Sequence, residues 1–178
     1  MEHKILFAGF GGQGLLFSGK VMAYKGLIED KHVSWLPSYG PEMRGGTANC
    51  SVVISDTPIG APIIPEPDIL VTMNLPSLDK FEATVRPGGI IMVDSTLVER
   101  KVERTDVEVY YIPATRMATE AGSPTLANMI LVGKLLEVLG EYDPAHVETA
   151  LGKCVSARHK DLYDLNLRAM ELGRSYRE

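Results

Sequence analysis

The sequence has few cysteines and no long apolar run. Its two cysteines, Cys50 and Cys154, are too few for a disulfide framework, a structural zinc site or an iron–sulfur cluster held by this chain alone. No stretch approaches the about 18 consecutive apolar residues of a membrane helix, and the apolar run at residues 5–10 is shorter than the core of an export signal. We therefore expect a cytoplasmic chain with no metal site and no membrane contact.

Positive charge is also scarce. Eighteen Lys and Arg residues face 23 Asp and Glu residues, which gives a net charge of −5 and an isoelectric point near 5.4. A nucleic-acid-binding protein needs a basic surface to displace counterions, so we exclude nucleic acid as a partner. At 178 residues and 45 % hydrophobic content, the chain suits one globular domain that spans residues 1–178.

Short apolar segments alternate with segments of helical periodicity. This alternation predicts an α/β fold: a single Rossmann-like domain with a mostly parallel sheet, helices on both faces and a helical C-terminal third. The expected strands are residues 4–8, 32–36, 47–55, 68–73, 90–93 and 107–112. The expected helices are residues 13–30, 74–85, 113–122, 126–139 and 158–176, with one more that begins at Asp143 and Pro144.

The sequence GFGGQG follows the first expected strand and opens the first expected helix. Its glycines, Gly9, Gly11 and Gly14, have the spacing of a dinucleotide-binding turn, in which the first permits a tight turn, the second admits a phosphate and the third packs helix on strand. The nicotinamide version also needs an acidic residue at the end of the second strand, where this chain has Leu36, Pro37 and Ser38 without a carboxylate. Binding of a free dinucleotide is thus disfavoured, and contact with another anion or a purely structural turn both stay open.

A second glycine-rich segment, SYGPEMRGG at residues 38–46, lies in a loop that is expected over residues 37–46 at the same sheet edge. Its Arg44 could bind a phosphate or carboxylate through bidentate hydrogen bonds beside the start of the helix. Equally, Arg44 could pair with Glu42 within the loop while Tyr39 packs beneath it. The loop could also be a docking surface for another subunit, since Tyr and Arg are favoured at interfaces.

The remaining polar residues suggest structural roles. Cys50 is expected inside a strand as a small core residue, and Asp94 is expected to cap a turn, although a strand end could also carry a catalytic acid. Asn128, near the start of an apolar helix, is expected to satisfy buried backbone. The four histidines show neither metal-ligand spacing nor a catalytic arrangement, so we assign no catalytic residue and no metal ligand.

The two glycine-rich segments, taken together and in this order, resemble the gamma subunit of the 2-oxoacid:ferredoxin oxidoreductases, the family that acts on pyruvate, 2-oxoglutarate and branched-chain 2-oxoacids. The resemblance covers nearly the whole chain. It continues through EPDILVTMN, RPGGIIMVDST and NMILVGKLLEVLG, and less distinctively through Lys160, Asn166, Ala169 and Gly173. The segment SWLPSYGPEMRGGTANCSVVISD is similar to the 2-oxoglutarate and branched-chain types, with a mild preference for 2-oxoglutarate.

The resemblance implies a complex that decarboxylates a 2-oxoacid oxidatively with coenzyme A and passes electrons to ferredoxin. The complex would use thiamine diphosphate, magnesium and iron–sulfur clusters, none of them bound by this chain alone, in the company of alpha and beta subunits and with delta as a further candidate partner. The isolated chain would be inactive. It would contribute assembly and a wall near the cofactor and coenzyme A path, with the matching cofactor-binding positions Gly9, Gly11, Gly12, Gln13, Gly14 and Arg44. The alternative is a stand-alone Rossmann-type nucleotide-binding oxidoreductase.

Overall fold

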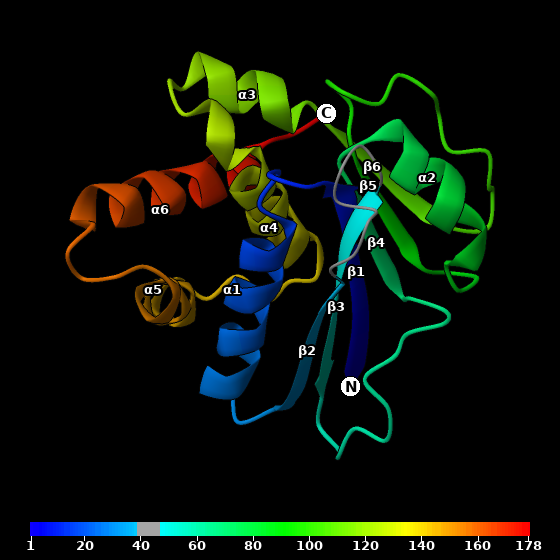
Figure 1. Ribbon diagram of the computed structural model, residues 1–178, viewed down its shortest axis with the longest axis horizontal. Helices are drawn as coiled ribbons and strands as arrows, with labels where there is room; N and C mark the ends of the chain where they lie inside the picture. Colours follow the sequence, from blue (N-terminus) through cyan, green and yellow to red (C-terminus); the bar gives the residue numbers. More distant parts are fainter. Residues whose placement is uncertain (39–46) are drawn as a thin grey trace.

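The protein is built around a six-stranded sheet (Figure 1). The computed structural model describes residues 1–38 and 47–178. The strands are β1 (Glu2–Phe10), β2 (His32–Ser38), β3 (Thr47–Ser55), β4 (Ile69–Thr72), β5 (Ile90–Asp94) and β6 (Glu108–Ile112). The helices are α1 (Leu15–Ile28), α2 (Leu75–Phe81), α3 (Ala114–Glu120), α4 (Ala127–Val138), α5 (Pro144–Cys154) and α6 (Lys160–Ser175), with short 3-10 helices η2 (Glu82–Thr84) and η3 (Pro124–Leu126).

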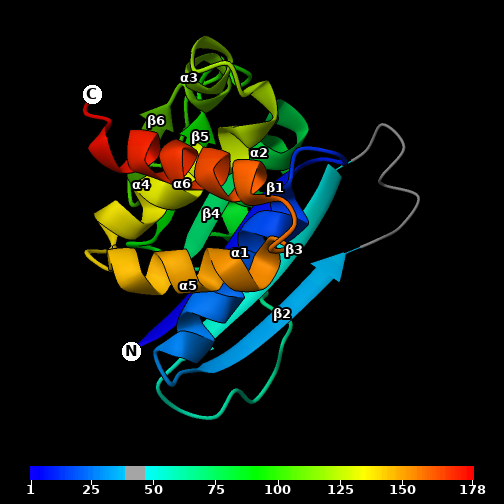
Figure 2. The ribbon, with the colours of Figure 1, turned by 90° about the vertical axis from the view of Figure 1, so that its left-hand side faces the viewer.

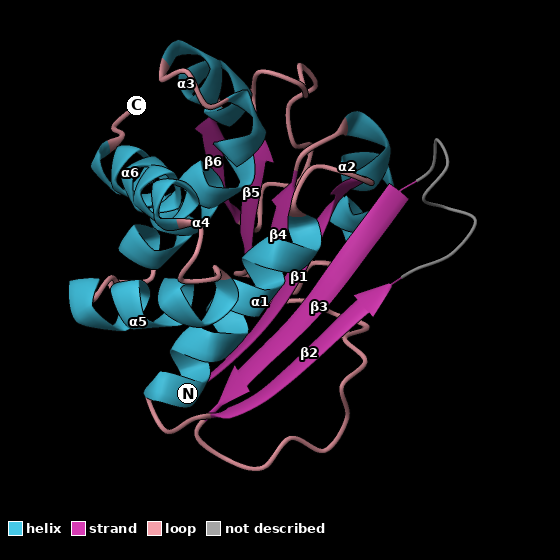
Figure 3. Ribbon diagram, turned by 60° about the vertical axis from the view of Figure 1, so that its left-hand side comes forward, coloured by secondary structure: helices cyan, strands magenta, loops and turns pink. Residues whose placement is uncertain are grey.

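The sheet is mostly parallel, as the sequence predicts. Its order is β2-β3-β1-β4-β5-β6, and the four strands from β1 to β6 run parallel. At the other edge, β3 is antiparallel to both β1 and β2, so that β2 and β3 form a long hairpin (Figure 3). Only residues 39–46 separate these two strands, whereas a parallel pair needs a crossover of about a dozen residues or more.

Strand β2 is longer than the sequence predicts, because Pro37 and Ser38 continue the strand instead of opening the loop. Pro37 lies opposite Cys50 of β3. Proline lacks the N–H that a central strand donates, but β2 is an edge strand and has only one neighbour.

Helices cover both faces of the sheet, as predicted. Side chains alternate along each strand, so Phe7 faces the core beneath α1 and α4, whereas Leu6 faces a smaller core beneath α2. In Figure 1, α1 and α4 lie on one side of the sheet and α2 lies on the other. Helices α5 and α6 form an outer layer over α1 and α4 (Figure 2), and with α4 they make the C-terminal third helical.

Helix α1 lies close to the β2–β3 hairpin because two of its residues are glycines. A Cβ at Gly19 would stand 2.5 Å from Cys50 Sγ, and a Cβ at Gly26 would stand 2.8 Å from Val33 Cγ2. Real Cβ atoms do not approach other atoms so closely. The two glycines therefore let α1 lie close to the sheet.

Helix α4 is the apolar helix expected over residues 126–139, and it is buried between the sheet and α6. Its crossing with α6 is unusually tight, because a Cβ at Gly133 would lie 1.9 Å from the Met170 carbonyl oxygen and a Cβ at Gly173 would lie 1.8 Å from that of Ile130. None of the helices in the described part of the chain is long and apolar enough to cross a membrane.

Candidate functional site

The glycine turn, defined here as Phe10–Gly14, connects β1 to α1 at the carboxyl end of the parallel strands. Gly9 lies within β1 rather than at the start of the turn. Gly12 and Gly14 have φ values of 90° and 79°, a left-handed conformation that favours glycine. The left-handed residues of the turn are thus Gly12 and Gly14, the second and fourth residues after the strand, while the expected tight turn at Gly9 is absent.

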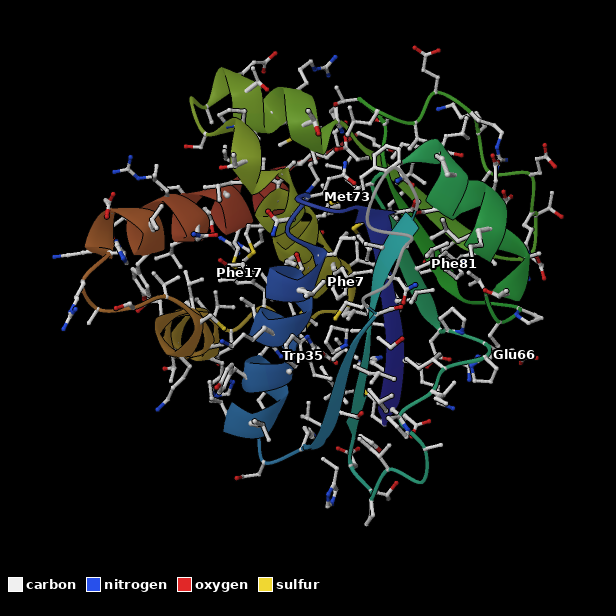
Figure 4. All side chains as sticks on the ribbon, viewed as in Figure 1. Phe7, Phe17, Trp35, Glu66, Met73 and Phe81 are labelled. Atoms are coloured by element: carbon white, nitrogen blue, oxygen red, sulfur yellow. The ribbon has the colours of Figure 1, made fainter. Side chains whose placement is uncertain are left out.

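Glycine is needed at position 9 because the side chain of Gln13 lies against it. A Cβ at Gly9 would lie 2.4 Å from Gln13 Oε1. That oxygen accepts a hydrogen bond of 2.6 Å from the Phe10 N–H, and Gln13 Nε2 donates one of 3.0 Å to the carbonyl of Met73, just beyond β4. Figure 4 labels Met73 beside the turn. The side-chain amide of Gln13 therefore ties the turn to the neighbouring strand.

Gly14 makes room for Asn128 of α4. The glycine spacing had suggested a different role, in which Gly14 lets α1 pack closely on a strand. A Cβ at Gly14 would lie 2.5 Å from Asn128 Nδ2. That nitrogen donates hydrogen bonds of 3.1 Å to the Gly14 carbonyl and to Ser18 Oγ. The expectation that Asn128 satisfies buried backbone is confirmed.

The exposed tip of the turn comprises Phe10, Gly11 and Gly12, and it lies at the start of a helix 14 residues long. Gly14 is the N-cap of α1 and has no side chain to cap the helix, and the first turn of α1 contains no acidic residue. The N-terminus of a helix carries a partial positive charge from its unpaired N–H groups. The turn thus presents exposed backbone at an end of the helix that favours an anion.

The ends of the β2–β3 hairpin lie at the same edge of the sheet as the glycine turn. In the strand register, Phe10 lies opposite Thr47, and Ser38 lies opposite Asn49, which pairs with Ala8. Ser38 and Thr47, the described residues that flank residues 39–46, therefore lie at the same sheet edge as the turn. Arg44, Glu42 and Tyr39 lie outside the described residues, so the proposed role of Arg44 as an anion ligand stays a prediction.

Asp94, at the end of β5, has a structural role. It is fully buried, and its carboxylate accepts hydrogen bonds from Thr115 Oγ1 at 2.6 Å and from the N–H of Thr96 at 3.1 Å. The N–H of Thr115 adds a longer bond of 3.3 Å. Asp94 thus caps the turn after β5 and the start of α3, as expected for a turn-capping residue.

The two thiols are not activated nucleophiles. Burial raises the pKa of Cys50 to about 12 and that of Cys154 to about 11, so both are protonated at neutral pH, and thiols react as thiolates. Cys50 is the buried strand residue that we expected. Among residues 1–38 and 47–178, no group of three or more His, Cys, Asp or Glu side chains could hold a metal ion. These side chains do not fit an iron–sulfur cluster or the metal of a thiamine cofactor.

Comparison with known proteins decides the family. The sequence profile described as "Pyruvate ferredoxin/flavodoxin oxidoreductase" matches residues 4–176. The chain belongs to this family. The resemblance inferred from its glycine-rich segments is thereby confirmed.

Several family members are similar over most of the chain. The ketoisovalerate oxidoreductase subunit VorA of Methanothermobacter thermautotrophicus is 39 % identical over 97 % of this chain, but the match covers only 36 % of the relative. The chain thus spans about a third of that relative's length. The 2-oxoglutarate synthase subunit KorC of Methanocaldococcus jannaschii is 37 % identical, with 85 % of this chain and 82 % of the relative covered.

Solved structures agree with this assignment. The gamma subunit of a keto/oxoacid ferredoxin oxidoreductase from Geobacter sulfurreducens superposes with a TM-score of 0.81 and 30 % identity, over 97 % of this chain and 96 % of that one. The 2-oxoglutarate:ferredoxin oxidoreductase of Magnetococcus marinus shares the fold, with a TM-score of 0.86 and 21 % identity, over 98 % of this chain and 30 % of the longer one.

One charged cluster in this family member was not expected from the sequence. Buried Lys25 of α1 contacts Glu29 Oε1 at 2.6 Å and Glu141 Oε2 at 3.7 Å. Each carboxylate also contacts a histidine: His146 Nδ1 lies 3.0 Å from Glu29, and His3 Nε2 lies 2.7 Å from Glu141. Only the spacing of Lys25 and Glu29 on one helix could have been found in the sequence. This cluster joins β1, α1 and α5.

Proposed function

We propose that the chain is the gamma subunit of a multi-chain 2-oxoacid:ferredoxin oxidoreductase, which works in the cytoplasm with alpha and beta subunits and with delta as a further candidate. The complex would carry out coenzyme A-dependent oxidative decarboxylation and would reduce ferredoxin. The carbon and electron chemistry belongs to thiamine diphosphate, magnesium and iron–sulfur clusters in partner chains. The observation that carries this proposal is the family match, together with side chains in the described residues that suit neither cofactor.

Within the complex, the glycine turn would form part of the wall near the cofactor and coenzyme A path. The exposed tip and the uncapped start of α1 favour a negatively charged group, such as the diphosphate of coenzyme A or of thiamine. Gly9, Gly11, Gly12, Gln13 and Gly14 shape this surface, and Arg44 would add the charge. The carboxyl edge of a parallel sheet is the usual place for ligands in α/β proteins.

Replacement of Arg44 tests this anion site. Arg44→Ala should weaken coenzyme A use or thiamine diphosphate retention by about 1 to 3 kcal/mol, the range for loss of a charge-assisted hydrogen bond. The coenzyme A KM and the thiamine content of the reconstituted complex measure the effect. Normal assembly with both values unchanged would eliminate the anion site, and failure to assemble would instead assign Arg44 to the subunit interface.

For the substrate, we propose 2-oxoglutarate, with branched-chain 2-oxoacids as the nearest competitor. Relatives that resemble this chain in length include 2-oxoglutarate synthase subunits at 34 to 37 % identity, whereas the more identical ketoisovalerate oxidoreductase subunit is a much longer chain. Assay of the native complex with 2-oxoglutarate, ketoisovalerate and pyruvate separates these substrates. A higher kcat/KM for ketoisovalerate would reject the preference.

The alternative of a stand-alone nucleotide-binding oxidoreductase is disfavoured by the topology. In a dinucleotide-binding fold, the second strand lies beside the first and carries the acid that binds the ribose. Here β3 separates β2 from β1, and β2 ends at Ser38 without a carboxylate. Purification of the tagged chain under native conditions discriminates the two functions: larger chains that carry iron and thiamine support the complex, and a lone active protein supports the alternative.

A further inference from the structure

Asn128 connects α4 to the glycine turn across a long sequence separation. Its side-chain nitrogen donates to the carbonyl of Gly14, which is the N-cap of α1, and to Ser18 one turn further along the helix, both at 3.1 Å. The residue is 4 % exposed. The side-chain amide of Asn128, which is shielded from solvent, therefore holds Gly14 in its left-handed backbone conformation.

The side-chain amide of Asn128 is paired at its nitrogen only. Asn128 Oδ1 is buried and has no hydrogen-bond partner among residues 1–38 and 47–178. A buried unpaired acceptor destabilises the folded state, and an apolar residue of similar shape would remove that penalty. The orientation of the amide is set by its nitrogen, because turning it over would place two oxygens, those of Asn128 and Gly14, against each other.

Gln13 holds the other side of the turn. Its amide oxygen accepts from the Phe10 N–H, and its amide nitrogen donates to Met73 at the end of β4. Both polar atoms of this side chain are thus used within the protein. The part of the turn left exposed between the two amides is the tip, with Gly11 and Gly12 at its centre.

We propose that Asn128 and Gln13 are positioning residues, which hold the glycine turn in one conformation so that its exposed main chain can contact an anionic ligand. The ligand is then recognised by backbone at Gly11 and Gly12, and neither amide side chain touches it. This inference rests on the proposed function of the turn. It goes further in assigning two roles that the glycine spacing does not indicate.

The test compares Asn128→Ala with Asn166→Ala. Asn166 is a matched control on α6, away from the turn, and is 5 % exposed. Its Nδ2 donates one bond of 2.7 Å to the Leu162 carbonyl, and its Oδ1 likewise has no partner among the described residues. Amide hydrogen exchange in the full-length chain should be about tenfold faster at residues 13 and 18 in Asn128→Ala, because the N–H groups of Gln13 and Ser18 donate to the Phe10 and Gly14 carbonyls. Tenfold corresponds to about 1.4 kcal/mol, which is within the range for the loss of the two Asn128 hydrogen bonds. Asn166→Ala should leave those residues unchanged.

The same variants are then reconstituted into the complex with its partner chains. We expect the coenzyme A KM to rise about tenfold in Asn128→Ala at unchanged kcat. In Asn166→Ala the coenzyme A KM should stay unchanged, even if the two substitutions lower the melting temperature by the same amount. Unchanged exchange at the turn would overturn the inference. Faster exchange with unchanged coenzyme A KM and thiamine content would show that the turn meets no ligand, which overturns the proposed function of the turn and the positioning role with it.

Should Asn128→Ala fail to fold, Gln13→Met provides the second variant. It removes both hydrogen bonds of the Gln13 side chain and adds no charge beside the proposed anion site. We expect faster exchange at residues 13 and 18 and the same rise in coenzyme A KM at unchanged kcat. Unchanged amide exchange at the turn together with an unchanged coenzyme A KM in this variant would also overturn the inference.

Discussion

Glu141 lies in the loop after α4, where β1 and α1 meet the start of α5. The hydrogen bond from His3 lowers the pKa of this carboxyl from its ordinary value of 4.5, and the nearby charge of Lys25 acts in the same direction. The folded state therefore favours the ionised form. The stability that this group contributes is present above about pH 4.5 and is lost as the pH falls through the lower pKa of the folded state.

Glu141→Gln should therefore weaken the acid dependence of folding. Urea denaturation from about pH 7 to about pH 3 should show a variant that is less stable than the parent at neutral pH and loses less stability on acidification. Glu148→Gln replaces an exposed carboxylate on α5 and serves as the control, with an acid dependence like that of the parent. Parallel curves for Glu141→Gln and the parent would contradict the expected contribution of the His3 contact.

The roles of Gln13 and Asn128 differ in how far the sequence could predict them. Asn128 was expected to satisfy buried backbone because an amide at the start of an apolar helix needs a partner. Its partner, Gly14, could not be predicted, because the contact joins residues that only the folded chain brings together. Gln13 was expected to face a ligand, and only the structure shows that its side chain bonds to Met73.

At the scale of elements, the crossing of α4 and α6 depends on Gly133 and Gly173. Each faces the backbone of the other helix, so an added methyl group would force the helices apart. Gly133→Ala and Gly173→Ala should each lower the free energy of unfolding by about 1 to 3 kcal/mol, the usual cost of overpacking. Urea denaturation measures this loss.

Gly152 provides the matched control for this prediction. It lies inside α5, and a Cβ there would have its nearest neighbour at 4.0 Å, on Tyr163. Because alanine favours the helix and no clash opposes it, Gly152→Ala should raise stability by up to about 1 kcal/mol. Equal effects of the three substitutions would mean that helix propensity, and not the crossing, determines the outcome.

Most helices and strands could be predicted from the periodicity of the sequence, but the direction of β3 could not. Apolar periodicity and turn residues indicated where elements begin and end, as for α4 and for α5 with its Asp143 cap. The same signals say nothing about which strand pairs with which. The antiparallel hairpin follows from the short connection at residues 39–46, a constraint on chain length that periodicity does not contain.

At the scale of the whole molecule, we predict that the isolated chain lacks oxidoreductase activity. The purified chain should contain no iron and no thiamine, and it should not turn over any 2-oxoacid with a dye acceptor. The physical reason is that the chain lacks suitable ligands for these cofactors. Both of its thiols are protonated, and no group of side chains in the described residues could hold a metal ion. Co-expression with the partner chains should restore activity, and turnover by the chain alone would reject the proposed division of labour.

The burial of α4 between the sheet and α6 also determines when the fold can be completed during synthesis. A ribosome makes α4 before α6, so the outer side of α4, where Gly133 lies, stays uncovered until residues 160–175 have emerged. A nascent chain at that stage exposes apolar surface that the finished protein hides. During this interval the growing chain therefore presents an apolar helix surface to chaperones that bind such surfaces.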